Sequence, residues 1–424
     1  MKVLLKLAIR NLIAAGLRTW LNVIVLSLTF VVIIAAQGLF RGMGDQAARA
    51  SIDYEFGGGQ FWHPAYDPYD PLTIQDAHGL IPAELKPLIA AGQATPILVI
   101  QGTLYPQGRF LPVLIKGIDP SQKILSIPSE FLAASAAESE GESWPAEFTT
   151  SEKATGAYER MRIPDEIPAI IGTRMAATAR LSVGDTVILR WRDSRGAFDA
   201  RPVRIVHIFR TIVQSVDAGQ VWIPLRVLQE MAGMPGEATV VTLAPGAASP
   251  PGNIPAAAGG WVYRDLRYLL RDIDQLVAAK TAGSATVYVI LLFMSLLAIF
   301  DTQVLNIFHR IREIGTLVAL GLTRRQVVLL FTLEGTLHAV LAAVLAAIYG
   351  YPLLSAFASH GWKMPEAFDS FGIALGERLM PVFTGGIIIG TVILILSLTA
   401  IISFWPARRL SRMRPTDALR GKLQ

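Results

Sequence analysis

Four long apolar runs divide the chain. A helix that crosses a hydrocarbon layer needs about 20 residues with hardly a charge. The first run, Leu21–Phe40, and the fourth carry no charged side chain, whereas the second contains Asp301 near its end and the third contains Glu334 and His338. The pattern predicts membrane helices at residues 20–41, 281–307, 327–353 and 380–405.

Residues 42–280, between the first and second spans, read as a large α+β domain. Short alternating segments predict strands at 97–101, 113–116, 186–191, 203–209 and 240–243. Three- and four-residue spacing predicts helices at 169–181 and 225–232, and another at 265–282 that leads without a break into the second span. Residues 133–160 resemble a flexible insertion, and 244–260 a surface loop.

The orientation follows from lysine and arginine, because short basic segments stay in the cytoplasm. Basic residues gather before the first span, between the second and third, and after the fourth. Both termini are therefore expected in the cytoplasm, together with residues 308–326 and 406–424. The 42–280 domain and the short segment 354–379 then face outward. Residues 1–19 form a candidate amphipathic helix on the inner leaflet, the alternative being a plain positive anchor for the first span.

Composition agrees with a membrane protein, since 52% of the 424 residues are hydrophobic and only 17% are charged. The net charge of +5 lies largely at the inner rims, which favours contact with anionic membrane lipids over nucleic acid. Without cysteine, the outer domain folds without disulfides. Ala48-Arg49-Ala50 has cleavage-like spacing, but a cleaved first helix would leave the two tails on opposite sides.

The segment 308–326, Phe-His-Arg-Ile-Arg-Glu-Ile-Gly-Thr-Leu-Val-Ala-Leu-Gly-Leu-Thr-Arg-Arg-Gln, joins two spans on the inside. It is a short amphipathic stretch with a charged start and a basic end, too close to the membrane to be a domain. Such an element suits docking into a groove on a cytoplasmic partner. The alternative is a merely cationic loop.

This segment resembles the arginine-rich stretch of the FtsX/MacB-type permeases of ABC transporters. The tail Trp405-Pro406-Ala407-Arg408-Arg409, with Pro415 and Ala418-Leu419-Arg420, is similar to the family's ending. In the outer domain, residues 170–176, 181–187 and 221–225 with Asp217 look like the family's extracytoplasmic core. The resemblance implies a coupling helix that contacts the ATPase through Arg310, Arg312, Glu313, Ile314, Gly315, Leu320, Gly321, Arg324 and Arg325.

The polar residues inside the spans leave alternatives open. Glu334 and His338 lie four residues apart and share a helix face, so they could form a proton relay or a substrate site. A structural role for Glu334, bonded to a neighbouring helix, is the favoured hypothesis. Asp301 is expected at the inner boundary. Gly386 and Gly390 form a G-x-x-x-G pair that permits close helix contact.

Catalytic motifs are missing from the sequence. It holds no G-x-x-x-x-G-K-[ST] phosphate loop, no G-x-S-x-G and no H-E-x-x-H, and His63, His78 and His207 are isolated along the chain. We expect no enzyme activity, no metal and no cofactor of its own, with ATP and Mg on a partner ATPase.

The resemblance implies a permease subunit in the bacterial inner membrane, paired with a second permease chain, identical or related. Length and four-helix plan are most similar to lipoprotein-releasing permeases of the LolC/LolE kind, so the outer domain would handle a lipoprotein, a periplasmic carrier or an adaptor. Two alternatives stay open: MacB-like efflux of small molecules or peptides, and FtsX-like regulation of an extracytoplasmic hydrolase. The sequence does not name the cargo.

Overall fold

A computed structural model of the chain describes residues 8, 17–133, 166–247, 260–310, 316, 321–363 and 378–410. The chain forms two compact units. The helical unit comprises residues 1–44, 275–364 and 377–424, and the sheet unit comprises residues 45–274 and 365–376. The predicted helix at 1–19, the insertion at 133–160 and the tail at 406–424 lie largely outside the described residues.

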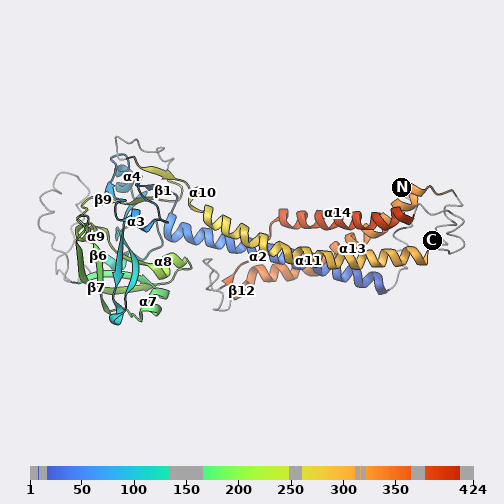
Figure 1. The fold of residues 1–424 in the computed structure, drawn as a ribbon, viewed down its shortest axis with the longest axis horizontal. Helices are drawn as coiled ribbons and strands as arrows, with labels where there is room; N and C mark the ends of the chain where they lie inside the picture. Colours follow the sequence, from blue (N-terminus) through green and yellow to red (C-terminus); the bar gives the residue numbers. More distant parts are fainter. Residues whose placement is uncertain are drawn as a thin grey trace. The chain divides into compact units, whose positions relative to one another are not determined.

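Four helices are long and apolar enough to cross a membrane within the described residues: Trp20–Phe56, Arg271–Leu305, Arg324–His360 and Gly385–Arg408. They belong to α2 (Leu17–Ser51), α11 (Arg271–His309), α13 (Arg324–His360) and α14 (Gly385–Leu410), drawn in Figure 1. The first continues past the predicted end at residue 41, and a π-helical turn, η1 (Ile52–Phe56), follows it. Residues 42–51 hold no proline, and Ala47, Ala48 and Ala50 favour helix, which offsets the low helix propensity of Gly42 and Gly44.

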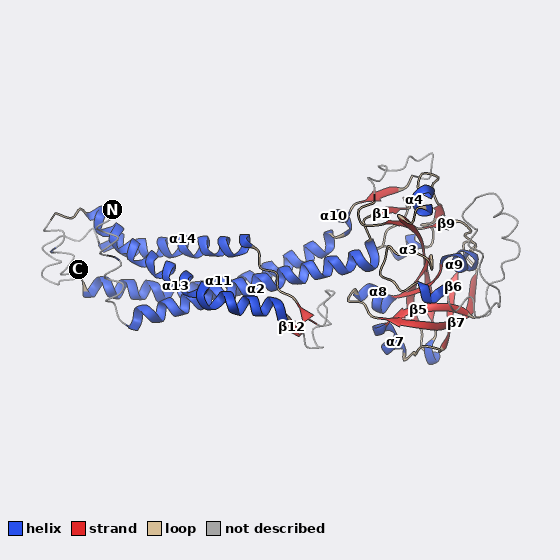
Figure 2. Ribbon diagram, turned by 180° about the vertical axis from the view of Figure 1, so that it is seen from behind, coloured by secondary structure: helices blue, strands red, loops and turns tan. Residues whose placement is uncertain are grey.

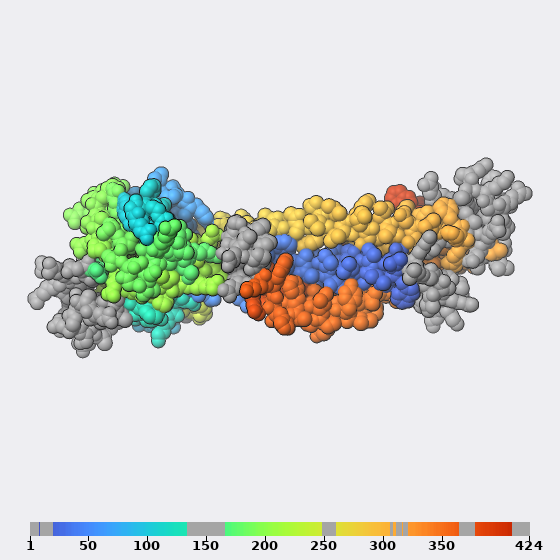
Figure 3. Space-filling view, turned by 90° about the horizontal axis from the view of Figure 1, so that it is seen from below, coloured from blue at the N-terminus to red at the C-terminus, as the bar shows by residue number. Residues whose placement is uncertain are grey.

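Polar and small side chains connect the helices of the helical unit. Asn22 on α2 donates to Thr302 on α11 over 2.5 Å, and Thr29 bonds Ser295 at 2.6 Å, so these two helices run antiparallel. Figure 3 shows α11 (yellow), α2 (blue) and α13 (orange) side by side on one face. Where apolar side chains face lipid as well as one another, close packing and interhelical hydrogen bonds hold helices together.

The segment between α13 and α14 contains a small antiparallel pair, β12 (Trp362–Lys363) and β13 (Arg378–Leu379). Residues 364–377 between these strands lie outside the described part of the chain. The backbone N–H of Val382, just beyond β13, donates to the carbonyl of Gly38 on α2 over 2.9 Å.

The sheet unit is mixed α+β (Figure 2). Its main sheet has, among the described residues, nine strands in the order β11-β1-β10-β3-β4-β8-β5-β7-β6. Their bounds are β1 Gln60–Trp62, β3 Ala94–Leu104, β4 Leu111–Ile118, β5 Ile167–Gly172, β6 Thr186–Arg192, β7 Phe198–Phe209, β8 Gln220–Pro224, β10 Val240–Leu243 and β11 Val262–Arg264. A separate pair joins β2 (Gly79–Leu80) to β9 (Glu237–Ala238).

Short helices flank these strands: α3 Pro71–Ile74, α4 Lys86–Ala90, α7 Thr173–Ala179, α8 Gln214–Gly219, α9 Leu225–Ala232 and α10 Leu266–Leu269, with a 3₁₀ turn, η2, at Pro106–Gly108. Within the main sheet β4 pairs in parallel with β8, and β5 with β7, while the remaining pairs are antiparallel. β3 also pairs with β6, which closes strands β3, β4, β8, β5, β7 and β6 into a ring.

Alternate residues of the central strands fill two separate cores. Leu98 and Ile100 on β3 join one cluster with the buried faces of α7 and α9, whereas Ile97 and Val99 join another with Trp222 and Val216. Strands covered on both faces consist of continuous apolar runs, and β5 is buried at all six positions. Strand β6, which is covered on one face, instead alternates buried and exposed positions.

Two sequence predictions differ from the structure. The helix predicted over 169–181 begins only at Thr173, since residues up to Gly172 form β5. Periodicity cannot separate a short buried strand from a buried helix, and here the run is covered on both faces. The helix predicted at 265–282 is interrupted at Leu270, between α10 and α11. A turn over residues 182–185 separates α7 from β6: the Asp185 carboxylate accepts from the Ser182 N–H, and β6 follows at once.

Candidate functional site

A buried ion pair joins two membrane-length helices of the helical unit. Arg310, directly after α11, places Nη1 at 3.3 and 3.4 Å from the two carboxylate oxygens of Glu334 on α13. The Glu334 side chain is 3% exposed and that of Arg310 is 23% exposed. The guanidinium also lies 5.7 Å from the ring centroid of Phe331, one turn before Glu334. A carboxylate that is buried in this way is stabilised by a paired cation.

The structure places Arg310 against α13, although the sequence assigned it to the contact with a cytoplasmic ATPase. Its side chain fixes the beginning of the 308–326 segment to the helix that follows that segment. The ATPase contact of this residue stays a prediction. The interhelical bond of Glu334 agrees with the structural role favoured from the sequence.

His338 lies one turn beyond Glu334 on the same buried face of α13, as the four-residue spacing predicts. Its Nδ1 lies 2.7 Å from the backbone carbonyl of Glu334, and because a carbonyl only accepts, the proton is on Nδ1. Nε2 is buried and has no hydrogen-bond partner among the described residues. Among the described residues, no hydrogen bonds therefore connect the His338 ring to the Glu334 carboxylate, as a proton relay would require.

Sequence reasoning missed a close approach of three helices at Gly335. A Cβ at this position would come within 3.0 Å of the Ser403 side chain on α14 and 3.3 Å from Nε2 of Gln303 on α11. The Gln303 amide and the Ser403 hydroxyl are buried without hydrogen-bond partners among the described residues. The signal was present, since Gly335 follows the intramembrane Glu334 and Ser403 is a polar residue in an apolar run.

The basic segment is described only in part. Arg312, Glu313, Ile314, Gly315 and Leu320 lie outside the described residues, whereas Gly321, Arg324 and Arg325 lie within them. Gly321 has φ +104°, which glycine adopts without steric cost. The Thr323 hydroxyl accepts from the Gln326 N–H and the Gln326 side chain accepts from the Thr323 N–H, a capping box that starts α13.

Arg324 and Arg325 occupy the exposed first turn of α13. Positive charge is unfavourable at a helix N-terminus, where the aligned peptide dipoles leave partial positive charge. Local stability therefore does not account for these two residues. They present cations to the surface next to a sharply defined helix start.

Asp301, Gly386 and Gly390 are the other positions that the sequence singled out inside the spans. Asp301 is exposed on α11 and forms no salt bridge among the described residues. Gly386 and Gly390 on α14 have no atom within 4 Å of a built Cβ, so the described part of the chain makes no close helix contact there. Because both glycines are exposed, the predicted close helix contact could form only with another chain.

In the sheet unit, the structure brings together segments that the sequence had singled out. The Asp217 Oδ2 accepts from the Arg174 N–H at the start of α7 and lies 3.5 Å from Arg174 Nη1. Gly172 leaves room for this approach, because a Cβ there would come within 3.0 Å of Asp217. Burial raises the pKa of Asp217 above its usual 3.8, against the opposing effect of Arg174.

Substitution of Asp217 by asparagine should remove a pH dependence of stability. Because the folded-state pKa is raised, protonation of Asp217 favours the folded state. This contribution is complete below 3.8 and is lost as pH rises through the folded pKa. We expect the melting temperature of the native protein, relative to Asp217→Asn, to fall as pH rises from below 3.8 toward neutrality. The exposed Asp199→Asn is the control, and a constant difference would contradict the assignment.

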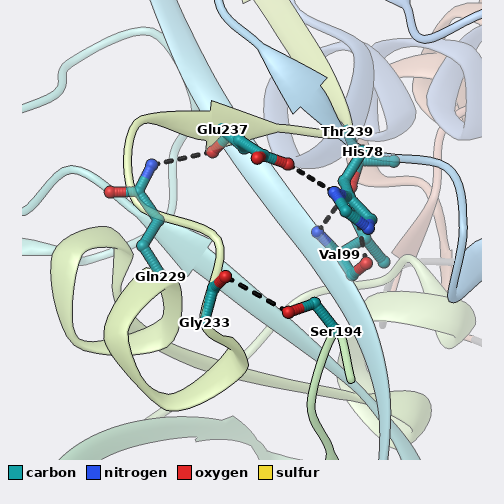
Figure 4. A network of polar contacts seen from close by, with 7 residues as sticks. All are labelled: His78, Val99, Ser194, Gln229, Gly233, Glu237 and Thr239. Atoms are coloured by element: carbon teal, nitrogen blue, oxygen red, sulfur yellow. Dashed lines mark hydrogen bonds and ion pairs between the residues drawn. The ribbon is translucent and has the colours of Figure 1, made fainter. Parts of the chain in front are cut away.

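A second polar network holds the edge of the sheet unit (Figure 4). The His78 ring pairs with the Glu237 carboxylate, and the Gln229 amide donates to the Glu237 carbonyl over 2.7 Å. Thr239 accepts from the Val99 N–H over 3.0 Å. Burial lowers the pKa of nearby His63; His78 adds to this effect and Glu237 opposes it. These bonds tie β2 and β9 to α9 and β3, which is a structural arrangement.

His207 stacks on Phe131 with ring centroids 4.0 Å apart. It is not part of the network around His78 and Glu237. In the described ranges, no three His, Cys, Asp or Glu side chains are grouped so that they could hold a metal ion.

The described residues thus form four membrane-length helices, with an α+β unit between the first and second and a basic segment before the third. Residues 285–415 match the family of FtsX-like permease C-terminal domains. This match covers less than half of the chain, and together with the relatives it supports the resemblance to the FtsX/MacB-type permeases of ABC transporters.

Relatives among characterised proteins include two that are named as macrolide export proteins. The chain is 24% identical over 139 residues to the macrolide export ATP-binding/permease protein MacB of Campylobacter jejuni, covering 33% of this chain and 19% of that protein. It is 25% identical over 163 residues to MacB of Rhodopirellula baltica, covering 38% and 22%. The matched part thus spans about a fifth of the length of these relatives.

Among solved structures, the extracellular domain of the ABC-type transporter YknZ from Gram-positive bacteria aligns at 13% identity with a TM-score of 0.27. The alignment covers 49% of this chain and 98% of that domain.

Proposed function

We propose that this chain is the membrane-spanning subunit of an ABC transporter whose ATPase is carried by another polypeptide. The observation that carries the proposal is the match over 285–415, which runs from α11 through the basic segment to α14. Within it, the capping box at Thr323 and the exposed Arg324 and Arg325 support docking of a cytoplasmic partner. The partner supplies ATP and Mg.

The arrangement in the cell follows from the same proposal. The chain lies in the bacterial inner membrane with both termini in the cytoplasm, and it pairs with a second permease chain. The sheet unit, residues 45–274 and 365–376, then faces the periplasm and handles a lipoprotein or its carrier. Efflux of small molecules is the second candidate, favoured by the similarity to proteins named macrolide exporters. Regulation of an extracytoplasmic hydrolase is the third.

Replacement of Glu313 by alanine and Gly315 by valine should uncouple the ATPase from the permease. These residues lie at the centre of the proposed docking segment, so their loss weakens transmission without touching the spans. We expect stimulation of the co-purified ATPase to fall about tenfold, within the usual range of coupling free energies. The measurement is ATP hydrolysis by the reconstituted complex.

Glu84→Ala, an exposed carboxylate of the sheet unit, is the matched control and should keep full stimulation. Unchanged stimulation in the Glu313 and Gly315 variants would overturn the docking assignment. Release of a radiolabelled lipoprotein from proteoliposomes, compared with export of a macrolide, separates the first two candidate functions.

A further inference from the structure

The sheet unit contains a cavity of about 300 Å³ that is separate from the Asp217 and His78 contacts. Its wall is rich in aromatic side chains: Phe56, Trp62, Tyr66, Tyr69 and Tyr268. Aliphatic side chains from β3, β4 and β10 complete it. The Tyr66 ring meets Trp62 edge-on at 5.1 Å, and Tyr268 does so at 5.9 Å, which fixes the orientation of the aromatic wall. Cavities of this size and lining are typical of small-ligand sites.

Three polar side chains line one part of this cavity. Lys116 on β4 is 6% exposed and Gln220 on β8 is 2% exposed, so both are almost fully buried. The parallel register pairs Leu114 with Gln220 and Lys116 with Trp222, which puts Lys116 and Gln220 on the same face of the sheet. Glu55 Oε1 lies 3.4 Å from Lys116 Nζ and 3.4 Å from Gln220 Nε2.

This polar group has unused hydrogen-bonding capacity. The buried Gln220 Oε1 has no partner among the described residues. An ammonium group carries three donors, and the described contacts of Lys116 Nζ are one carboxylate oxygen and the Trp222 ring at 5.1 Å. An unpaired buried acceptor is costly, so the group is suited to a ligand that brings one donor and one acceptor.

The charges of the cavity cancel. Glu55 compensates Lys116, and at the rim Arg271 lies 3.7 Å from Asp272, which also accepts from the Tyr69 hydroxyl. A charged ligand would find no net opposite charge to offset its loss of water. Burial also raises the pKa of Tyr66, with the charge of Glu55 as a second cause, so its hydroxyl stays neutral. The lining therefore favours a neutral ligand.

We propose that this cavity binds an apolar ligand that carries one secondary amide, whose C=O accepts from Lys116 and whose N–H donates to Gln220. Two classes of ligand carry such an amide. One is an N-acylated chain, and the other is a peptide with a hydrophobic side chain next to its peptide bond. Binding concerns the sheet unit alone and does not depend on the ATPase coupling proposed above.

The test compares two nearly isosteric, water-soluble probes on the full chain in nanodiscs by calorimetry. N-(2-phenylethyl)acetamide carries the N–H, whereas 2-phenylethyl acetate has an ester oxygen in its place. We expect the amide to bind about tenfold more tightly than the ester. The variant Gln220→Leu should lower the affinity for the amide to that for the ester and leave the affinity for the ester unchanged. Equal binding of both probes to the native chain would overturn the proposal.

Further probes define the ligand, and a further variant controls for misfolding. N-methylhexanamide replaces the aromatic body by an acyl chain, so the tighter of the two amides identifies the source. The anion 3-phenylpropanoate should bind more weakly than the amide, and tighter binding of the anion would overturn the neutral-ligand assignment. Tyr69→Ala changes a side chain that is 73% exposed and cannot unfold the core. It should weaken both amides, and empty nanodiscs should take up neither.

Discussion

Replacing Arg310 by alanine is expected to destabilise the helical unit by about 3–5 kcal/mol, because it removes a guanidinium that pairs with the buried Glu334 carboxylate. Glu334→Gln should cost less, since the remaining guanidinium is partly exposed and is not confined to a buried site. The double variant Arg310→Met with Glu334→Met removes both charges and should recover most of the loss. Unfolding of the purified protein in detergent, followed by circular dichroism, gives the comparison.

Arg325→Ala is the matched control, because this arginine lies at the same end of α13 but is exposed. Its effect on stability should stay within about 0.5 kcal/mol, as for surface substitutions in general. If Arg310→Ala unfolded at the same denaturant concentration as the native protein, the carboxylate would not depend on the guanidinium. Since Arg310 opens the basic segment, its loss should also lower ATPase stimulation, whereas the double variant recovers stability without recovering stimulation.

Substitution of Gly335 by alanine should produce the second large effect. The added Cβ would come within 3.0 Å of Ser403, where α13 and α14 are in contact, and overpacking of this kind costs about 1–3 kcal/mol. Ser403→Gly in the same chain removes the two nearest atoms and should restore stability. The double-mutant cycle measures this interaction directly.

Gly386→Ala on α14 is the control for Gly335→Ala, because a Cβ there meets nothing within 4 Å. Alanine is the better helix former, so this variant should be more stable by about 0.5–1 kcal/mol. A clear loss of stability at Gly386 would instead indicate a contact with a second chain. Equal, small effects at both glycines would contradict the close approach at Gly335.

The sequence by itself determined four membrane-length helices and the place of the α+β unit. Spans are readable because a hydrocarbon layer demands a long run without charge, whatever the neighbours are. The basic segment at 308–326 was equally local. The Thr323–Gln326 capping box that starts α13 is also a local signal, but it was recognised only in the structure. The strands at 186–191 and 240–243 were found because short alternating or apolar runs between turns are local signals too.

Only the tertiary structure decided which polar residues meet. Arg310 and Glu334 are 24 residues apart, and Gly335 meets Ser403 from another helix, so no sequence spacing announces these contacts. The same holds for the cavity, where Glu55, Lys116 and Gln220 come from three distant segments. The strand at Ile167–Gly172 was hidden for a related reason, because burial on both faces removes the alternation that marks a strand. Local patterns fix elements, whereas sites arise where the packing of those elements brings distant side chains together.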